Sequence, residues 1–438
     1  MTAAVLVKPK AQPTLRQMLV LWVPLAASMV MMVLEPSIIN AGLGRTSDAE
    51  LALAAYGVAF SLALLVEAPI LMILDASVAR STDRQAFALI RRFTLGLGLL
   101  VTAVGLIVSL TPLYGLIVER LMNIPADIAA RARPTLEILS FWPLPIAWRR
   151  AHQGVLIHAG RTAMISVATV VRLVALTIAL FGGLFLLPKG GAVVAGIAMD
   201  ISVFAEAGVV TWAVQPILRA GRFRPGTPAD DQPPLALREL WQFYRPLLVT
   251  TIFGQSTRPL LNAGIAMAAL SRASLAAWPV AWGLNLLITG PAWSLQQFTT
   301  ALSADETAYR QVKRFSLGLS LILTLLFAMI AFTPLYGLVM GGVYNLSPEL
   351  QELARPATQI MVIYPLLAGA QALLRGLLIR GGCTGVVRTA MLLDISILGA
   401  TLLLGVTVLT LSGCTLAAVA VLAGLLAEVG WLQWKKNC

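Results

Sequence analysis

Long apolar runs separated by short polar connections occupy almost the whole chain. A helix needs about 20 residues to cross the ~30 Å apolar layer of a bilayer. On that measure the pattern predicts about twelve membrane-spanning helices, near residues 17–41, 52–79, 90–117, 132–155, 163–187, 192–217, 240–268, 273–301, 313–340, 353–378, 386–410 and 414–434. A polar, proline-rich stretch at 221–236 predicts a linker. It divides the chain into lobes 1–220 and 237–438.

The two halves of the chain are copies of one another. The sequence of Thr111–Leu116 recurs at Thr333–Leu338, and that of Asn40–Gly42 recurs at Asn262–Gly264, both at a spacing of 222 positions. A constant spacing over most of the length indicates an internal repeat. Because each half holds an even number of helices, both halves enter the membrane from the same side. We therefore predict an all-α membrane protein with two parallel six-helix repeats around a central cleft.

Composition agrees with a multi-pass membrane protein. Of the 438 residues, 58% are hydrophobic and 12% are charged, and the mean hydropathy is +0.84. The formal net charge of +12 does not indicate a nucleic-acid partner, because the basic residues lie in the short connections between apolar runs. They gather on one side of the predicted helices, which orients both termini toward the cytoplasm. The first apolar run lacks a small-residue cleavage site, so we expect a helix of the cytoplasmic membrane rather than a signal peptide.

The residues that carry enzyme or cofactor chemistry are sparse. Cys383, Cys414 and Cys438 match no metal or redox spacing, and the chain has two histidines. We find no nucleophile–base pair, no phosphate-cradling loop and no motif that would bind ATP. We therefore expect no cofactor, no metal and no enzyme activity, and a monomer whose partners are the lipid bilayer and a small molecule. A receptor without transport remains an alternative.

An arginine lies inside one of the apolar runs. Arg258 follows Gly254 and Gln255 and precedes Pro259. A charged side chain at membrane depth costs at least ~2.5–3.5 kcal/mol on insertion scales, so it marks a functional site by default. The proline predicts a break in the helix beside the charge, and transporters bind cargo at such breaks. In the structural alternative, Arg258 caps freed carbonyls or pairs with a nearby acid.

The repeat brings a second charge to the same depth. The position equivalent to Glu35 is Thr257, next to Arg258. We therefore predict that Glu35 and Arg258 face each other across the cleft and pair when cargo is absent. Trp282 and Trp293 are candidates for an aromatic wall, although interfacial tryptophans are common. The substrate-binding residues that we expect are Arg258, Asn262, Gln255, Glu35, Asn40 and Glu67.

Three more ionisable residues lie within the apolar runs. Arg172 and Asp200 fall near the midplane on antiparallel neighbours, so we predict an ion pair that locks the fifth and sixth helices. Asp394 is the repeat equivalent of Arg172, so the second lobe lacks this pair. An unpaired carboxyl at that depth is disfavoured as an anion by desolvation, which suits a proton carrier. A hydrogen-bonded carboxyl packed inside the lobe is the alternative. Asp394 and Glu35 are the candidate coupling residues.

The predicted architecture resembles the multidrug, oligosaccharide-lipid and polysaccharide (MOP) exporter superfamily. Within it, Ala55–Leu62 (AYGVAFSL) and Gln255–Asn262 (QSTRPLLN) resemble the progressive ankylosis family, whose vertebrate member is associated with export of pyrophosphate, ATP or citrate. The resemblance implies a secondary transporter whose lobes rock around a cavity lined by helices 1, 2, 7 and 8. The connections here are shorter, and the acidic tail of the vertebrate protein is missing.

The leading functional hypothesis is a secondary transporter of an organic or phosphate-bearing anion, such as a pyrophosphate-, nucleotide- or citrate-like molecule. A cation-coupled multidrug exporter is the first alternative, in which Glu35 or Glu67 would bind a cationic cargo. A flippase for a lipid intermediate is the second alternative.

Overall fold

The computed structural model describes residues 15–81, 84–159, 161, 163–220, 235–302, 306–381, 383–408 and 411–436. In these residues the regular secondary structure is helical, apart from one isolated bridge between Ala269 and Ser412. Most of the predicted linker, 221–234, lies outside the described residues.

The helices follow the apolar runs in both halves. Those of the first half are α1 (Leu15–Leu43), α2 (Ala49–Glu67), η1 (Ala68–Ile70), α3 (Ile73–Arg80), α4 (Arg84–Leu110), the π-helix η2 (Gly115–Leu121), α5 (Ala126–Leu139), α6 (Pro143–His158), α7 (Ala163–Leu186) and α8 (Gly191–Ala220). Those of the second half are α9 (Leu237–Met267), α10 (Ser271–Trp293), α11 (Leu295–Leu302), α12 (Glu306–Phe332), α13 (Leu335–Gly337), the π-helix η3 (Leu338–Val343), α14 (Pro348–Ile360), η4 (Met361–Ile363), α15 (Tyr364–Arg380), α16 (Thr384–Val408) and α17 (Gly413–Trp434).

Ten helical segments of the described chain are long and apolar enough to cross a membrane. Two further segments, α9 and the α5–α6 pair, are the repeat equivalents of α1 and of α14–α15, which are among the ten. This agrees with the prediction of about twelve helices. The predicted run 132–155 is in fact two helices, because the chain bends at 140–142 and Pro143 starts α6.

The repeat extends to individual hydrogen bonds and backbone angles. Tyr114 donates its hydroxyl to a carbonyl of α5, and its equivalent Tyr336 donates to a carbonyl of α14, both at 2.6 Å. Asn123 and Asn345, also 222 positions apart, have positive φ angles of 53° and 54°. The two halves therefore share one local fold.

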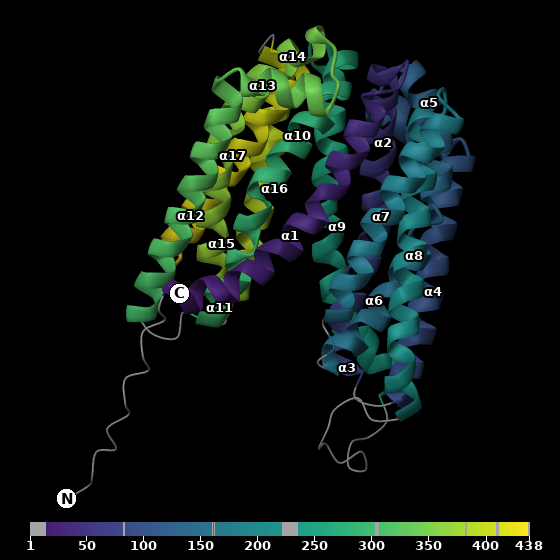
Figure 1. The fold of residues 1–438 in the computed structure, drawn as a ribbon, viewed down its shortest axis with the longest axis vertical. Helices are drawn as coiled ribbons and strands as arrows, with labels where there is room; N and C mark the ends of the chain where they lie inside the picture. Colours follow the sequence, from purple (N-terminus) through teal and green to yellow (C-terminus); the bar gives the residue numbers. More distant parts are fainter. Residues whose placement is uncertain are drawn as a thin grey trace, which may run out of the picture.

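Two helical bundles form the molecule (Figure 1). One contains α2–α8 and the other α10–α17, while α1 contacts both α7 and α10, and α9 contacts both α2 and α16. The bundles meet at one end, near α2 and α10, and diverge toward the other, where α3 and α11 lie (Figure 1). We call these the closed end and the open end. This arrangement agrees with the predicted two lobes, and α1 and α9 run between them.

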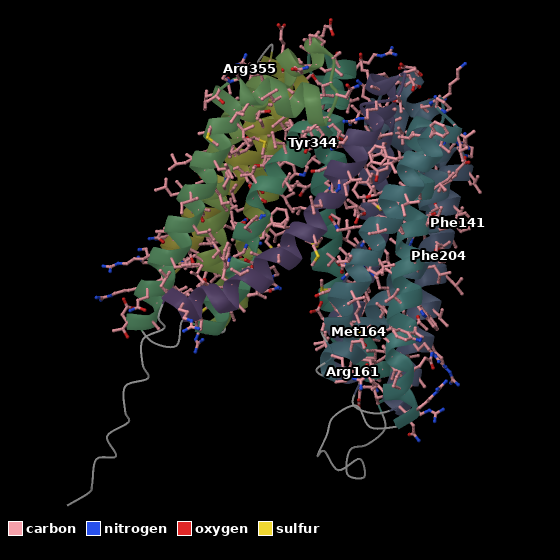
Figure 2. The ribbon with its side chains drawn as sticks, viewed as in Figure 1. Phe141, Arg161, Met164, Phe204, Tyr344 and Arg355 are labelled. Atoms are coloured by element: carbon pink, nitrogen blue, oxygen red, sulfur yellow. The ribbon has the colours of Figure 1, made fainter. Side chains whose placement is uncertain are left out.

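The outer surface of the bundles is apolar. Phe141 and Phe204 are 51% and 54% exposed on the outer side of the first lobe (Figure 2). Many leucine, isoleucine and valine side chains of α4, α7, α12 and α16 are exposed in the same way. An apolar surface of this extent is suited to lipid rather than to water. The chain is a multi-pass membrane protein.

Candidate functional site

A cavity of about 270 Å³ lies between the two lobes. Its wall comes from α1, α2, α9 and α10, the helices that the resemblance implied, and also from α15, α16 and α17. It therefore extends into the second lobe. Of the predicted site residues, those that line it are Asn40, Gln255, Arg258, Asn262 and Asp394.

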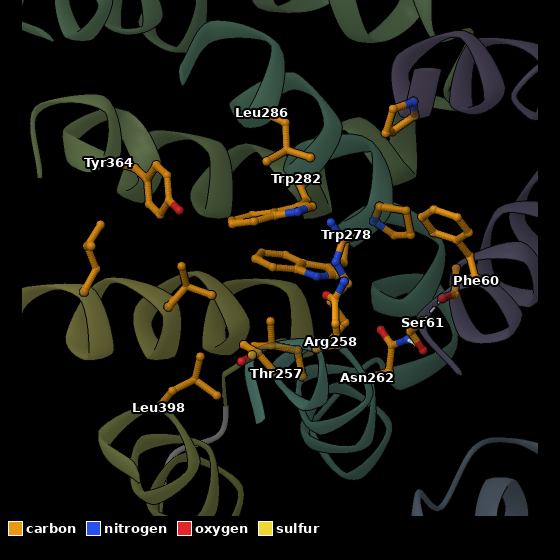
Figure 3. Close-up of a pocket in the computed structure, with 18 of the residues that line it drawn as sticks. Phe60, Ser61, Thr257, Arg258, Asn262, Trp278, Trp282, Leu286, Tyr364 and Leu398 are labelled. Carbon is orange, nitrogen blue, oxygen red and sulfur yellow. Dashed lines mark hydrogen bonds between the residues drawn. The ribbon is translucent and has the colours of Figure 1, made fainter. Parts of the chain in front are cut away.

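Arg258 extends from α9 into this cavity beside the ring of Phe60, with its Cζ 5.9 Å from the ring centroid (Figure 3). Within the described chain it forms no ion pair or hydrogen bond. The predicted helix break is wrong: α9 continues through Pro259. A proline removes only one donor from the helical ladder, and packing against neighbouring helices lets a membrane helix tolerate that loss.

Glu35 does not pair with Arg258. Its carboxylate lies 2.5 Å from a guanidinium nitrogen of Arg172, inside the first lobe. The physical reason is helical rotation: the repeat equivalent of Arg258 is Pro36, which lines the cavity, and Glu35 is turned by roughly 100° from that face. Glu35 is 7% exposed and does not line the cavity.

The predicted ion pair between Arg172 and Asp200 is also wrong. Arg172 contacts Glu206 at 3.4 Å in addition to Glu35, while a carboxylate oxygen of Asp200 has no hydrogen-bond partner in the described chain. Arg172 and Glu206 both lie roughly 23 Å along their helices from the α7–α8 connection, whereas Asp200 lies roughly 15 Å from it. Depth therefore favoured Glu206, which the sequence analysis did not consider as a partner.

Glu206 belongs to a clamp that the sequence analysis missed. Arg149 and Gln153 of α6 bind its carboxylate at 2.5 Å and 3.2 Å. The equivalent clamp in the second lobe holds Glu428 with Gln371 and Arg375 of α15, each at 2.6 Å.

Arginine and glutamine have exchanged places between the repeats, so each clamp supplies its glutamate with one arginine and one amide, and Glu206 contacts Arg172 in addition. The signal was present in the sequence, because arginine and glutamine are four residues apart on one helix face in both repeats.

Two other expected residues lie elsewhere. Glu67 is 2% exposed at the end of α2 and does not line the cavity. Trp293 is not part of the cavity wall either, whereas Trp282 is. Both lie too far along their helices: Glu67 comes seven residues after the lining residue Phe60, and Trp293 seven after Leu286, about 10 Å beyond them at 1.5 Å per residue.

Asn40 and Asn262 connect the lobes. The side-chain amide of Asn40 donates to the carbonyl of Pro279 at 2.8 Å, and that of Asn262 donates to the carbonyl of Gly57 at 3.2 Å. The donors are repeat equivalents, and so are the acceptors. Asn262 also donates to Ser61 at 2.9 Å (Figure 3). These bonds place both amides in the cavity wall and at the lobe interface.

Further bonds between the lobes seal the closed end. Arg45 donates to the carbonyl of Val343 at 2.8 Å, and Asn345 donates to that of Gly44, also at 2.8 Å. Tyr344, which lies near the closed end (Figure 2), donates its hydroxyl to Ser37 at 3.1 Å. Burial raises the pKa of Tyr344, which keeps this donor protonated.

Aromatic residues at equivalent positions line the cavity from both lobes. Tyr56 and Phe60 of α2 stack with centroids 5.4 Å apart, and their equivalents Trp278 and Trp282 of α10 stack at 5.7 Å. Tyr364 of α15 meets the Trp282 ring edge-on at 5.6 Å. Arg258 lies beside these rings (Figure 3). The cavity thus combines one guanidinium, one carboxyl and five aromatic rings.

Solved structures match the fold over nearly the whole chain. The inward-facing conformation of a multidrug resistance MATE family transporter of the MOP superfamily is 14% identical, with 94% of this chain and 97% of that chain covered and a TM-score of 0.74. Its outward-facing counterpart is 15% identical, with coverage of 98% and 96% and a TM-score of 0.62. The lipid II flippase MurJ in an inward closed conformation is 13% identical, with coverage of 96% and 88% and a TM-score of 0.69.

The fold is therefore that of the MATE-type transporters of the MOP superfamily, as predicted. No family model matches the chain. No curated protein matches it either.

Proposed function

We propose that this protein is a secondary transporter that moves an organic or phosphate-bearing anion across the cytoplasmic membrane. One observation carries the proposal: Arg258 lines the cavity between the lobes and has no ion-pair partner in the described chain. A guanidinium is always charged, and its fork of donors matches a carboxylate or a phosphate. An anion from solution supplies the missing partner.

Alternating access would supply the transport cycle. The cavity wall draws residues from both lobes, so bound cargo contacts each lobe and binds one lobe arrangement more tightly than the other. A ligand-driven change requires such a difference in affinity. The inward-facing and outward-facing conformations of the MATE family neighbour support two arrangements of this kind.

The orientation follows from the basic residues. The first turns of α4 and α12 carry several arginines and a lysine and begin next to α3 and α11, at the open end. The positive-inside rule favours an orientation in which the open end and both termini face the cytoplasm. The likeness to the progressive ankylosis family supports an anionic cargo, and we expect a monomer.

Asp394 is the coupling residue in this proposal. It lines the same cavity and forms no ion pair in the described chain. The titratable groups around it are Arg258 of α9, Tyr364 and Arg375 of α15, and Glu428 of α17. A proton on Asp394 removes a negative charge from the cavity, so proton binding and anion binding favour each other. Glu35, the other candidate, is already neutralised by Arg172.

A cation-coupled multidrug exporter is the second candidate. The observation that favours it is the presence of Asp394 beside five aromatic rings, because carboxylates and aromatic faces both attract organic cations. The multidrug MATE neighbour supports it as well. The likeness to MurJ supports a lipid flippase as a further alternative.

Flux in proteoliposomes tests the proposal. The protein is reconstituted in sealed vesicles, and uptake of labelled citrate, pyrophosphate and benzoate is compared with uptake of tetraphenylphosphonium and of a fluorescent lipid. Protein-dependent uptake of at least one anion, with none of the cation or lipid, is the expected result. Uptake of the cation alone would replace the proposal with the drug exporter, and lipid transfer alone would replace it with the flippase.

A further inference from the structure

Five aromatic residues line the cavity, two from the first lobe and three from the second. We call Tyr56, Phe60, Trp278, Trp282 and Tyr364 the aromatic wall. The two stacked pairs have interplanar angles of 12° and 24°, so the rings of each pair are nearly parallel. A wall of this kind binds planar rings by stacking. Aliphatic and inorganic anions have no ring and gain nothing from it.

The charge of the lining limits the charge of the cargo. Among the described lining residues, Arg258 is the one basic side chain and Asp394 the one acidic side chain. A polyanion such as pyrophosphate or citrate would bring two or more negative charges to a cavity with one cation and one opposing carboxyl. Like charges at short range repel strongly where water is scarce. The lining therefore favours a monoanion.

Size and hydrogen bonding favour a compact ligand. The cavity volume of about 270 Å³ is just below the ~300–1,000 Å³ typical of pockets for drug-sized ligands. Tyr56 is 4% exposed, and its hydroxyl has no hydrogen-bond partner in the part of the chain that the structure describes. A buried hydroxyl without a partner is unfavourable, so a polar group on the cargo would satisfy it.

We propose that the cargo is a compact aromatic monoanion, namely a one- or two-ring aromatic carboxylate. Its ring stacks on the aromatic wall and its carboxylate binds Arg258, whose guanidinium carbon lies 5.9 Å from the Phe60 ring centroid (Figure 3). A ring at Phe60 is thus within reach of the fork of donors. This inference rests on the proposed anion transport and narrows its substrate class.

Equilibrium binding to the purified full chain tests the inference with a matched pair of acids. Radiolabelled benzoate is the probe, and cyclohexanecarboxylate, of the same charge and similar size without a π face, is the competitor. Benzoate should bind about 2- to 12-fold more tightly, the range expected for one aromatic pair. Pyrophosphate should compete more weakly than either acid.

Variants locate the effect. Phe60→Leu and Trp282→Leu should each reduce the affinity for benzoate toward the affinity for cyclohexanecarboxylate. The affinity for cyclohexanecarboxylate itself should not change. Trp212→Leu is the control, because Trp212 is 71% exposed on α8, away from the cavity.

Equal affinities for the two ring acids, or tighter binding of pyrophosphate, in the wild-type protein would overturn the aromatic inference and leave anion transport standing. Binding of tetraphenylphosphonium with no anion bound would overturn both. Because the comparison of benzoate with cyclohexanecarboxylate and pyrophosphate uses the wild-type protein, it tests the aromatic inference even if a variant does not fold.

Discussion

Gly44 and Tyr344 approach so closely at the closed end that a Cβ on Gly44 would lie 1.9 Å from the carbonyl oxygen of Tyr344. No side chain fits at this position. The backbone of the α1–α2 connection therefore packs directly on the backbone that follows η3. Only glycine permits that contact between the lobes.

Replacing this glycine should open the seal. Gly44→Ala is expected to separate the lobes at the closed end, because the added methyl group meets backbone rather than a flexible side chain. Spin labels at Lys189 and Glu352, one in each lobe, should report longer distances than in the wild type. Gly182→Ala is the matched control, since a Cβ there meets nothing within 4 Å. An unchanged distance distribution would show that the seal lies elsewhere.

The exchanged clamps predict a rescue. Arg375→Gln leaves Glu428 buried, 0% exposed, without its cation. Breaking a buried pair in this way costs about 3–5 kcal/mol. Adding Gln371→Arg reproduces the order found in the first lobe and should recover most of that loss in thermal unfolding of the purified protein. Recovery no better than that of the single variant would mean that the two clamps are not interchangeable.

The ion pair between Arg172 and Glu35 predicts that two substitutions will have different effects on stability. Arg172→Gln removes the cation that pairs with Glu35 and should destabilise the protein by about 3–5 kcal/mol. Asp200→Asn should change stability little, since Asp200 forms no ion pair in the described chain. Thermal unfolding of both variants in one detergent is the measurement. A comparable loss for Asp200→Asn would restore the pair predicted from sequence.

Sequence reasoning found several polar residues of the cavity wall, missed most of its aromatic residues and misassigned the partners of its charges. The repeat spacing located Asn40 and Asn262, because equivalent residues on symmetric helices reach the same depth, and Arg258 was located by its charge inside an apolar run. It failed for Glu35, because depth does not determine the helix face, and one residue is a turn of roughly 100°.

For Arg172, depth along the helices favoured Glu206, but it did not indicate Glu35. Glu35 lies on α1, and the packing of α1 against α7 brings it to Arg172. The bend between α5 and α6 was missed for a different reason, since the apolar run continues across it.

Asp394 predicts how transport depends on pH. A protonated Asp394 no longer repels the anion, so binding should strengthen as pH falls, and a proton gradient should drive accumulation. Asp394→Asn mimics the protonated state. It should bind anion independently of pH and lose gradient-driven accumulation while retaining exchange. Uptake with and without an imposed pH gradient checks this, and a variant that still accumulates cargo would assign coupling to another residue.

Arg258 carries the central claim, and the initial rate of labelled anion uptake into proteoliposomes tests it most directly. Arg258→Ala should abolish anion uptake. Arg258→Lys should retain some binding but lose most of the transport, because a point charge cannot hold a planar anion through two parallel hydrogen bonds. Arg314→Ala, an exposed arginine of α12, is the control and should transport normally. Wild-type rates of anion uptake by Arg258→Ala would contradict the account.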